Sequence, residues 1–399
     1  MRVSIGALST GTPSKMQTGI LRIVCASIIG SVAVLPILIL PSMVGSLVDY
    51  AGFTATEAGW VAAVGFAGSA LGAMVVGLRI QHLDPRNLAV FGLLTLAVFD
   101  AAAMFVSQVP AWLFVTLRFL SGIGGAVVYA AVMAHVAATH EPERGYGIFM
   151  AFQFGISALG LYGLPLLLPH TGVAGMYFCL AAAASLSLLL RTSIMHREAA
   201  VEDAAIEFHM LIKPAAILAM LGIGCYETAN FMYFTYADRI GVGMGLPDYR
   251  VGEILGFASL LGIPSAMLVV WLGDRFGQLM PLLFAMLVAI ASLAWLLVPA
   301  GALTYVVSMS ALGFAWAFGL PFFYAFEARL DPGGSVVVVG GFFTACGTFI
   351  GPAFAANLVA SGGYDAALVG AIGVYVLVMC LIALASGFAS RNPGSCSSS

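Results

Sequence analysis

Apolar stretches of about twenty residues follow one another along almost the whole chain, separated by short segments rich in glycine, proline and charge. A helix needs about twenty mainly apolar residues to cross a bilayer. The alternation therefore predicts an all-α integral membrane protein with twelve spans. We expect helices at residues 19–47, 56–78, 87–108, 111–138, 146–168, 173–192, 213–237, 250–272, 279–299, 302–327, 334–358 and 364–389.

The longest polar stretch lies near the middle of the chain, at residues 191–213, and every other connection is short. Six expected helices precede it and six follow it. We therefore predict an N-terminal six-helix half (1–192), a cytoplasmic central linker (193–212) and a C-terminal six-helix half (213–399). The first apolar run is too long for the core of a signal peptide, so we interpret it as the first span.

Positive charges gather on one side of the predicted membrane. Two arginines, Arg239 and Arg250, fall on the side opposite the termini, and Arg118 falls within a helix. Because Lys and Arg concentrate on the cytoplasmic side, we expect both termini in the cytoplasm and the protein in the cell (plasma or inner) membrane. The residues on the side of the termini are Arg2, Lys15, Arg22, Arg79, Arg86, Arg144, Arg191, Arg197, Lys213, Arg275, Arg329 and Arg391.

The two halves carry a repeated glycine pattern. Gly52 and Gly59 flank the start of the second expected helix, and Gly245 and Gly252 flank the start of the eighth with the same spacing, 193 residues later. Parallel repeats of this kind are typical of transporters whose two halves surround a central site. The pattern therefore predicts two pseudo-symmetric halves.

Composition supports the membrane setting and argues against other classes. Hydrophobic residues make up 61% of the chain and charged residues only 8%, whereas soluble domains carry roughly 25% charged residues. The net charge of −3 argues against a nucleic-acid partner. The six cysteines are scattered, and His135 and His140 lack a third ligand at suitable spacing, so we expect no metal and no cofactor.

A short motif lies between the eighth and ninth expected helices and reads Trp271-Leu-Gly-Asp274-Arg275-Phe-Gly277-Gln278. It resembles the inner-loop signature of the major facilitator superfamily (MFS), an Asp-Arg pair followed by glycine. The resemblance implies the MFS fold, with Asp274, Arg275 and Gly277 in a cytoplasmic gate loop. An ordinary solvated turn is the alternative. The matching loop of the first half departs from the signature, because Gln81 stands where the Asp is expected.

The fourth expected helix carries a second motif, Arg118-Phe-Leu-Ser121-Gly122-Ile-Gly124-Gly125-Ala126. It resembles the fourth-helix signature of the same superfamily, which implies that Arg118 serves proton coupling or binds anionic substrate groups. Gly122 and Gly125 lie where small residues let another helix approach closely. The alternative is that the Arg118 side chain reaches the outer membrane interface.

Two further ionisable residues fall within expected spans, where such groups are functional candidates. Glu227 lies about midway along the seventh helix, and Asn230 follows it at helical spacing, so we expect both in the substrate cavity, with Glu227 as the protonation site. Asp100 lies at a depth similar to that of Arg118, which makes an ion pair feasible. Structural roles remain open for both acids. The tenth helix carries several aromatic residues, some of which should face the cavity.

These features predict a secondary transporter of a small organic solute, coupled to protons and working by alternating access as a monomer in the lipid bilayer. A glycine-rich fifth helix, residues 155–165, resembles exporter patterns and favours efflux. An uncoupled facilitator is the alternative, and a membrane-embedded sensor or enzyme a more distant one. Neither catalytic motifs such as H-E-x-x-H or G-x-S-x-G nor a phosphate-binding loop occurs, so we predict no enzymatic activity.

Overall fold

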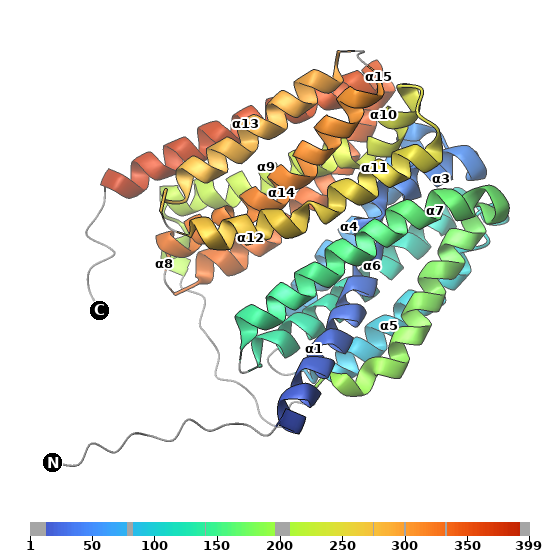
Figure 1. The fold of residues 1–399 in the computed structure, drawn as a ribbon, viewed down its shortest axis with the longest axis horizontal. Helices are drawn as coiled ribbons and strands as arrows, with labels where there is room; N and C mark the ends of the chain where they lie inside the picture. Colours follow the sequence, from blue (N-terminus) through green and yellow to red (C-terminus); the bar gives the residue numbers. More distant parts are fainter. Residues whose placement is uncertain are drawn as a thin grey trace.

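The computed structural model describes residues 13–77, 83–139, 141–195, 208–273, 275–298, 301–331 and 333–391, and these residues form helices joined by short turns (Figure 1). The first half contains α1 (Pro13–Ala33), α2 (Leu35–Leu38), α3 (Leu40–Ala51), α4 (Ala55–Gly77), α5 (Pro85–Ala103), α6 (Ala111–Ala137), α7 (Pro142–Ser187) and the 3-10 helix η2 (Leu188–Ser193). The second half contains α8 (Phe208–Leu211), α9 (Pro214–Thr235), α10 (Ala237–Gly243), α11 (Asp248–Leu260), α12 (Gly262–Leu272), α13 (Leu279–Leu296), α14 (Ala302–Leu330) and α15 (Ser335–Arg391).

Nine helical segments of the described residues are long and apolar enough to cross a membrane, and two of them hold two spans each. The 46 residues of α7 and the 57 residues of α15 are far longer than one crossing requires. Each reverses direction at a glycine whose backbone is not helical, Gly172 (φ 59°) in α7 and Gly363 (φ 70°) in α15. These nine segments therefore account for eleven crossings.

The first span consists of three consecutive helices, α1, α2 and α3, rather than one. Pro36 and Pro41 stand in the first turns of α2 and α3, where a missing N–H costs no helical hydrogen bond. The breaks fall at Val34 and Ile39, whose φ angles are −105° and −108°. With this interrupted span and the two reversals, the described residues contain twelve membrane crossings, and the predicted all-α membrane architecture is confirmed.

The 193-residue repeat extends to the ends of the helices. Ala55 begins α4 and Asp248 begins α11 at that separation, and Ala137 and Leu330 end α6 and α14 at the same separation. Gly52 and Gly245 both adopt positive φ, 75° and 86°, a conformation that glycine adopts without strain. The halves thus share the start of one helix pair, the end of another and a turn geometry.

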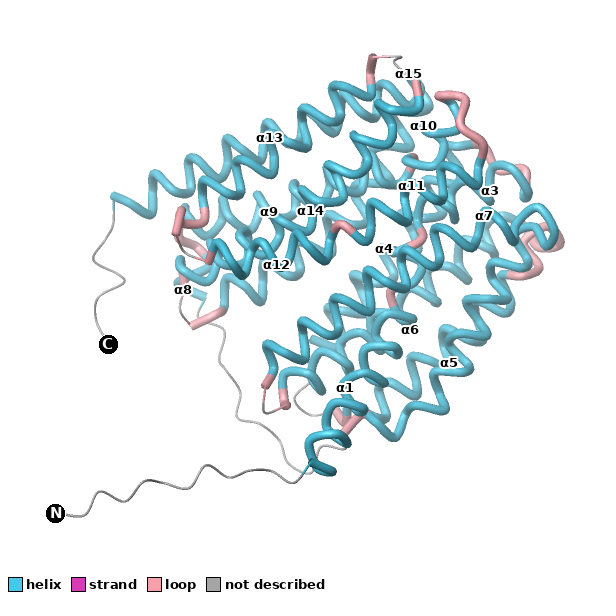
Figure 2. Tube along the Cα trace, viewed as in Figure 1, coloured by secondary structure: helices cyan, strands magenta, loops and turns pink. Residues whose placement is uncertain are grey.

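Helices of the two halves converge at one end of the molecule and diverge at the other (Figures 1 and 2). We call the first, where α3, α10 and α11 meet, the closed end, and the second, where α1 begins and α15 ends, the termini end. The second glycine of each repeat lies in the closed-end contact. A Cβ on Gly59 would meet Tyr236 Oη at 2.1 Å, and a Cβ on Gly252 would meet Leu161 O at 2.5 Å, so each glycine lets its helix approach the opposite half.

Candidate functional site

A cavity of about 710 Å³ lies between the two halves, a volume in the range of about 300–1,000 Å³ found for ligand pockets. Its wall includes residues of α4, α6 and α7 from the first half and of α9, α14 and α15 from the second. Gly77 and Tyr324, near the helix ends that lie at the termini end, belong to the wall, so the cavity extends in that direction. The described lining residues include two charged side chains, Arg118 and Glu227.

Arg118 forms a buried ion pair with Asp100. Ser121 Oγ donates a hydrogen bond to the same Asp100 oxygen, Oδ1, at 2.7 Å. The guanidinium carbon of Arg118 lies 5.1 Å from the centre of the Tyr177 ring, within reach of a cation–π contact. Arg118 is 3% exposed and Asp100 2% exposed. Arg118 therefore stays inside the helix bundle instead of reaching the interface, and its charge is compensated by an acid of the same half.

Close helix packing places Arg118 in the cavity wall. A Cβ on Gly122 would lie 2.0 Å from Gly65 O, and a Cβ on Gly125 would lie 2.6 Å from Ala33 O. Because any side chain at these positions would collide with backbone, α4 and α1 approach α6 more closely than larger residues would allow. The two glycines thus lie where the sequence predicts helix packing.

Glu227, on α9, presents its carboxylate to the cavity from the second half and is 2% exposed. Trp316 Nε1 on α14 donates a hydrogen bond to Glu227 Oε1 at 3.2 Å. Within the described ranges, no Lys, Arg or His forms an ion pair with this carboxylate. Among the described residues, the Glu227 carboxylate therefore has one polar side-chain partner, and this partner, Trp316, is uncharged.

Four rings of the cavity wall form an aromatic cluster that reaches this carboxylate through Trp316, and we define the cluster as Phe66, Phe231, Phe234 and Trp316. The Phe231 and Trp316 rings are 5.5 Å apart and nearly perpendicular, and Phe66 meets Phe231 edge to face at 5.8 Å. Phe234 lies 5.8 Å from Trp316. Phe66 comes from the first half and the other three from the second, so the cluster bridges the halves beside Glu227.

Asn230 does not line the cavity, contrary to expectation. Its Nδ2 donates to Tyr226 O at 3.0 Å, and Tyr375 Oη donates to its Oδ1 at 2.7 Å. A shift of three positions turns a helix by about 300°, so residues at this spacing share only part of a face. The face that carries Asn230 packs against α15, whereas Glu227 and Tyr233 face the cavity.

The predicted gate loop is described only in part, because Asp274 and Gln81 lie outside the described residues. Gly277 adopts φ 64°, as a tight turn requires of glycine. The Arg275 guanidinium carbon lies 5.1 Å from the centre of the Trp271 ring. The latch role of this loop stays a prediction.

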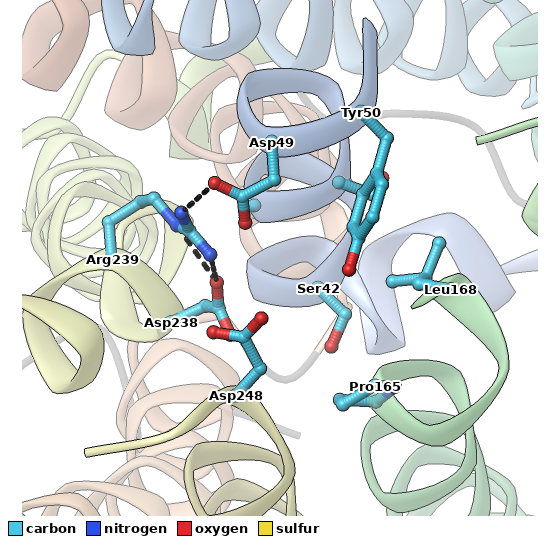
Figure 3. Close-up of a pocket in the computed structure, with 10 residues that line it drawn as sticks. Ser42, Asp49, Tyr50, Pro165, Leu168, Asp238, Arg239 and Asp248 are labelled. Atoms are coloured by element: carbon cyan, nitrogen blue, oxygen red, sulfur yellow. Dashed lines mark hydrogen bonds and ion pairs between the residues drawn. The ribbon is translucent and has the colours of Figure 1, made fainter. Parts of the chain in front are cut away.

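A cluster at the closed end was not anticipated from the sequence (Figure 3). Arg239 Nη1 contacts Asp49 Oδ1 of the first half at 2.7 Å, and Arg239 Nε contacts Asp238 Oδ2 at 2.9 Å. Beside it, Tyr236 Oη donates to Ala55 O at 2.9 Å. The Arg239–Asp49 and Tyr236–Ala55 bonds join the halves on the side away from the cavity mouth. The sequence signals that could have indicated this cluster were the acid Asp49 near the end of the first span and the Asp238–Arg239 pair near the end of the seventh.

Another buried acid, Glu327, lies near the termini end of α14 and is fully buried. Neither carboxylate oxygen has a hydrogen-bond partner within the described part of the chain. It packs against α15, where a Cβ on Gly340 would lie 2.5 Å from both of its oxygens. Glu327 is not part of the cavity wall.

Comparisons with known proteins agree with this architecture. A crystal structure of a mutant of the nucleoside transporter NupG superposes with a TM-score of 0.75 and 13% identity, covering 93% of this chain and 99% of that one. An uncharacterized protein of Caenorhabditis elegans is 27% identical over 119 residues, which are 30% of this chain and 23% of that protein. Residues 23–347 match the family model of the Major Facilitator Superfamily. The chain therefore belongs to the major facilitator superfamily and is a membrane transporter.

Proposed function

We propose that this transporter is a proton-coupled carrier of a small organic solute and that Glu227 is the group that binds the proton. The observation that carries the proposal is the position of Glu227, in the wall of a 710 Å³ cavity and with no described cationic partner. An acid within membrane-spanning helices is costly unless it has a function or a partner. Trp316 supplies one neutral donor, which leaves the carboxylate available for a proton or a substrate.

Alternating access requires that the closed end open when the termini end closes. The ion pair between Asp49 and Arg239 joins the two halves and breaks in this step. The ion pair between Asp100 and Arg118 connects α5 and α6 of one half and can persist throughout. With both termini in the cytoplasm, as the distribution of Lys and Arg predicts, the cavity faces the cytoplasm in this conformation.

The test is transport by the purified protein in sealed vesicles, after a solute panel has been screened for solute-dependent proton movement. We expect a pH gradient to drive the selected solute uphill. Glu227→Gln should abolish this uphill movement while leaving exchange down a solute gradient, because the amide cannot carry the proton. The matched control is Glu253→Gln, which alters an exposed acid paired with Arg250.

Glu327→Gln distinguishes the buried glutamates Glu227 and Glu327. We expect this variant to retain coupled transport, because Glu327 lies outside the cavity wall. If Glu227→Gln retains full uphill transport and Glu327→Gln loses it, the protonation site is Glu327. If no pH gradient drives the parent protein although it equilibrates the solute, the alternative of an uncoupled facilitator replaces the proposal.

A further inference from the structure

The two charged side chains of the cavity wall differ in how their charge is compensated. Asp100 neutralises Arg118 within the first half, and Ser121 donates to the same acid. Glu227 has a neutral donor, Trp316, and no described cation. With Glu227 ionised, the described cavity wall therefore carries one uncompensated negative charge. An anionic ligand would gain little from an arginine that is already paired, and it would be repelled by Glu227.

Hydroxyl groups in the wall are largely engaged with the protein backbone. Ser69 Oγ donates to Gly122 O at 3.1 Å, Ser157 Oγ donates to Leu38 O at 3.0 Å, and Thr344 Oγ1 donates to Gly340 O at 3.1 Å. Hydroxyl protons used in this way are not available to a ligand. A solute with many hydrogen-bond acceptors would leave several of them unpaired in this cavity, and unpaired buried polar groups are costly.

Eight aromatic residues are among the described residues that line the cavity. The aromatic cluster lies beside Glu227, and further rings line the same cavity. These further rings are Tyr129, Phe154, Tyr233 and Tyr324. The face of an aromatic ring carries partial negative charge and attracts a cation, most strongly where water is excluded. Rings and carboxylate therefore favour the same ligand, one that combines an apolar body with a positive charge.

We propose that the substrates of this carrier are lipophilic organic cations, with an aromatic or aliphatic body that contacts the rings and a single positive charge that approaches Glu227. The proposal rests on the proposed function, because it makes the cation and the proton compete for one carboxylate. Nucleosides and other polyhydroxylated solutes, as well as organic anions, fit this wall less well.

The test compares two probes of nearly the same shape and opposite charge, tetraphenylphosphonium and tetraphenylborate, with uridine as a polar third probe. Binding to the purified full-length protein in detergent is measured by calorimetry, with empty micelles subtracted. We expect tetraphenylphosphonium to bind at least about tenfold more tightly than either other probe. Its affinity should fall as the pH is lowered from about 8 to about 6, because protons compete for the carboxylate.

Variants at Glu227 assign the binding to this residue. Glu227→Gln should weaken tetraphenylphosphonium binding by about tenfold and remove its pH dependence, whereas Glu227→Asp should retain the pH dependence and Glu253→Gln should match the parent protein. If the glutamine variant does not fold, the two probes of opposite charge and the pH series on the parent protein still decide the matter.

The outcomes separate this inference from the proposed function. Equal or tighter binding of tetraphenylborate or uridine overturns the cation proposal, and coupled transport of another solute through Glu227 would still support proton coupling. Glu227-dependent binding of tetraphenylphosphonium that is insensitive to pH supports the cation proposal and contradicts proton coupling at this residue.

Discussion

The two halves of the molecule treat a membrane-buried charge in different ways. In the first half, Arg118 and Asp100 neutralise each other, with Ser121 as a further partner. In the second half, Glu227 faces the same cavity with a single neutral donor, Trp316. The halves share two helix boundaries at a separation of 193 residues, the starts of α4 and α11 and the ends of α6 and α14. The positions equivalent to Arg118 and Asp100 nevertheless hold Ala311 and Leu293. The repeat therefore extends to the arrangement of the helices but not to the buried charged residues.

The difference indicates which charge can change during transport. The charge of the paired Arg118 does not change during transport, because a guanidinium group stays protonated in proteins. A carboxylate without a cationic partner can exchange a proton or a cationic ligand without breaking an existing ion pair. On the proposed function, we therefore expect the first half to hold a fixed charge pair and the second half to hold the exchangeable site.

The largest expected effect concerns the fixed pair. Asp100→Asn leaves the buried Arg118 charge uncompensated, and breaking a buried pair by removing one partner costs about 3–5 kcal/mol. We expect a clear drop in the thermal denaturation midpoint of the purified protein in detergent. By contrast, Glu227→Gln removes an uncompensated charge and should leave the midpoint unchanged or raise it.

A double variant tests the physical reason for that drop. In Asp100→Leu with Arg118→Met, neither charge remains, and apolar replacement of a buried pair is often neutral for stability. The midpoint should therefore return close to the parent value. Equal midpoints for Asp100→Asn and the parent protein would show that the pair contributes no stability, and the proposed division between the halves would fail.

Much of the scaffold could be predicted because its signals are local or periodic. Apolar length predicts each span, and loop charge predicts which spans end on the same side. The pairing of Asp100 with Arg118 was foreseeable for a similar reason: both lie at similar depth on consecutive helices joined by a short turn. Even the reversals inside α7 and α15 coincide with expected gaps between spans.

Contacts that depend on distant helices could not be predicted in this way. Helical spacing placed Asn230 near the face of Glu227, but the packing of Tyr375 on α15 decides that Asn230 points elsewhere. Likewise, Asp49 and Arg239 are 190 residues apart and meet only because this conformation brings the halves together at the closed end. Sequence periodicity predicts which residues share a face of a helix, but it does not predict which other helix packs against that face.

We expect an intermediate effect for the Asp49–Arg239 ion pair, which connects the two halves. The Asp100–Arg118 pair, in contrast, lies within the first half. Asp49 is one-third exposed, so its bond to Arg239 should contribute only about 1 kcal/mol, a shift of roughly fivefold between conformations. We expect Asp49→Asn to open the closed end more often without lowering the denaturation midpoint as Asp100→Asn does.

Labelling of a cysteine behind this ion pair measures the opening. Ser42 is 3% exposed and lines the small pocket beside Arg239, so a membrane-impermeant maleimide should modify Ser42→Cys slowly. In the Asp49→Asn background we expect labelling to be roughly fivefold faster. The parent protein gives the rate for the native cysteines. An unchanged rate would mean that Asp49 does not hold the closed end shut.

The smallest expected effect concerns the one described polar contact of Glu227. Trp316→Phe keeps a ring but removes the donor to Glu227 Oε1, and a single hydrogen bond of this kind is worth about 0.5–1.5 kcal/mol. Binding of tetraphenylphosphonium should weaken by roughly two- to tenfold. The control is Trp295→Phe, which alters an exposed tryptophan on α13 and should change nothing.

A double-mutant cycle decides whether Trp316 acts through the carboxylate. In the Glu227→Gln background the donor no longer orients a charge that binds the cation, so adding Trp316→Phe should have little further effect on affinity. If the two substitutions instead weaken binding independently and additively, Trp316 contributes only as a ring surface. Glu227 would then bind the cation without a contribution from the Trp316 hydrogen bond, although Trp316 Nε1 lies 3.2 Å from Glu227 Oε1.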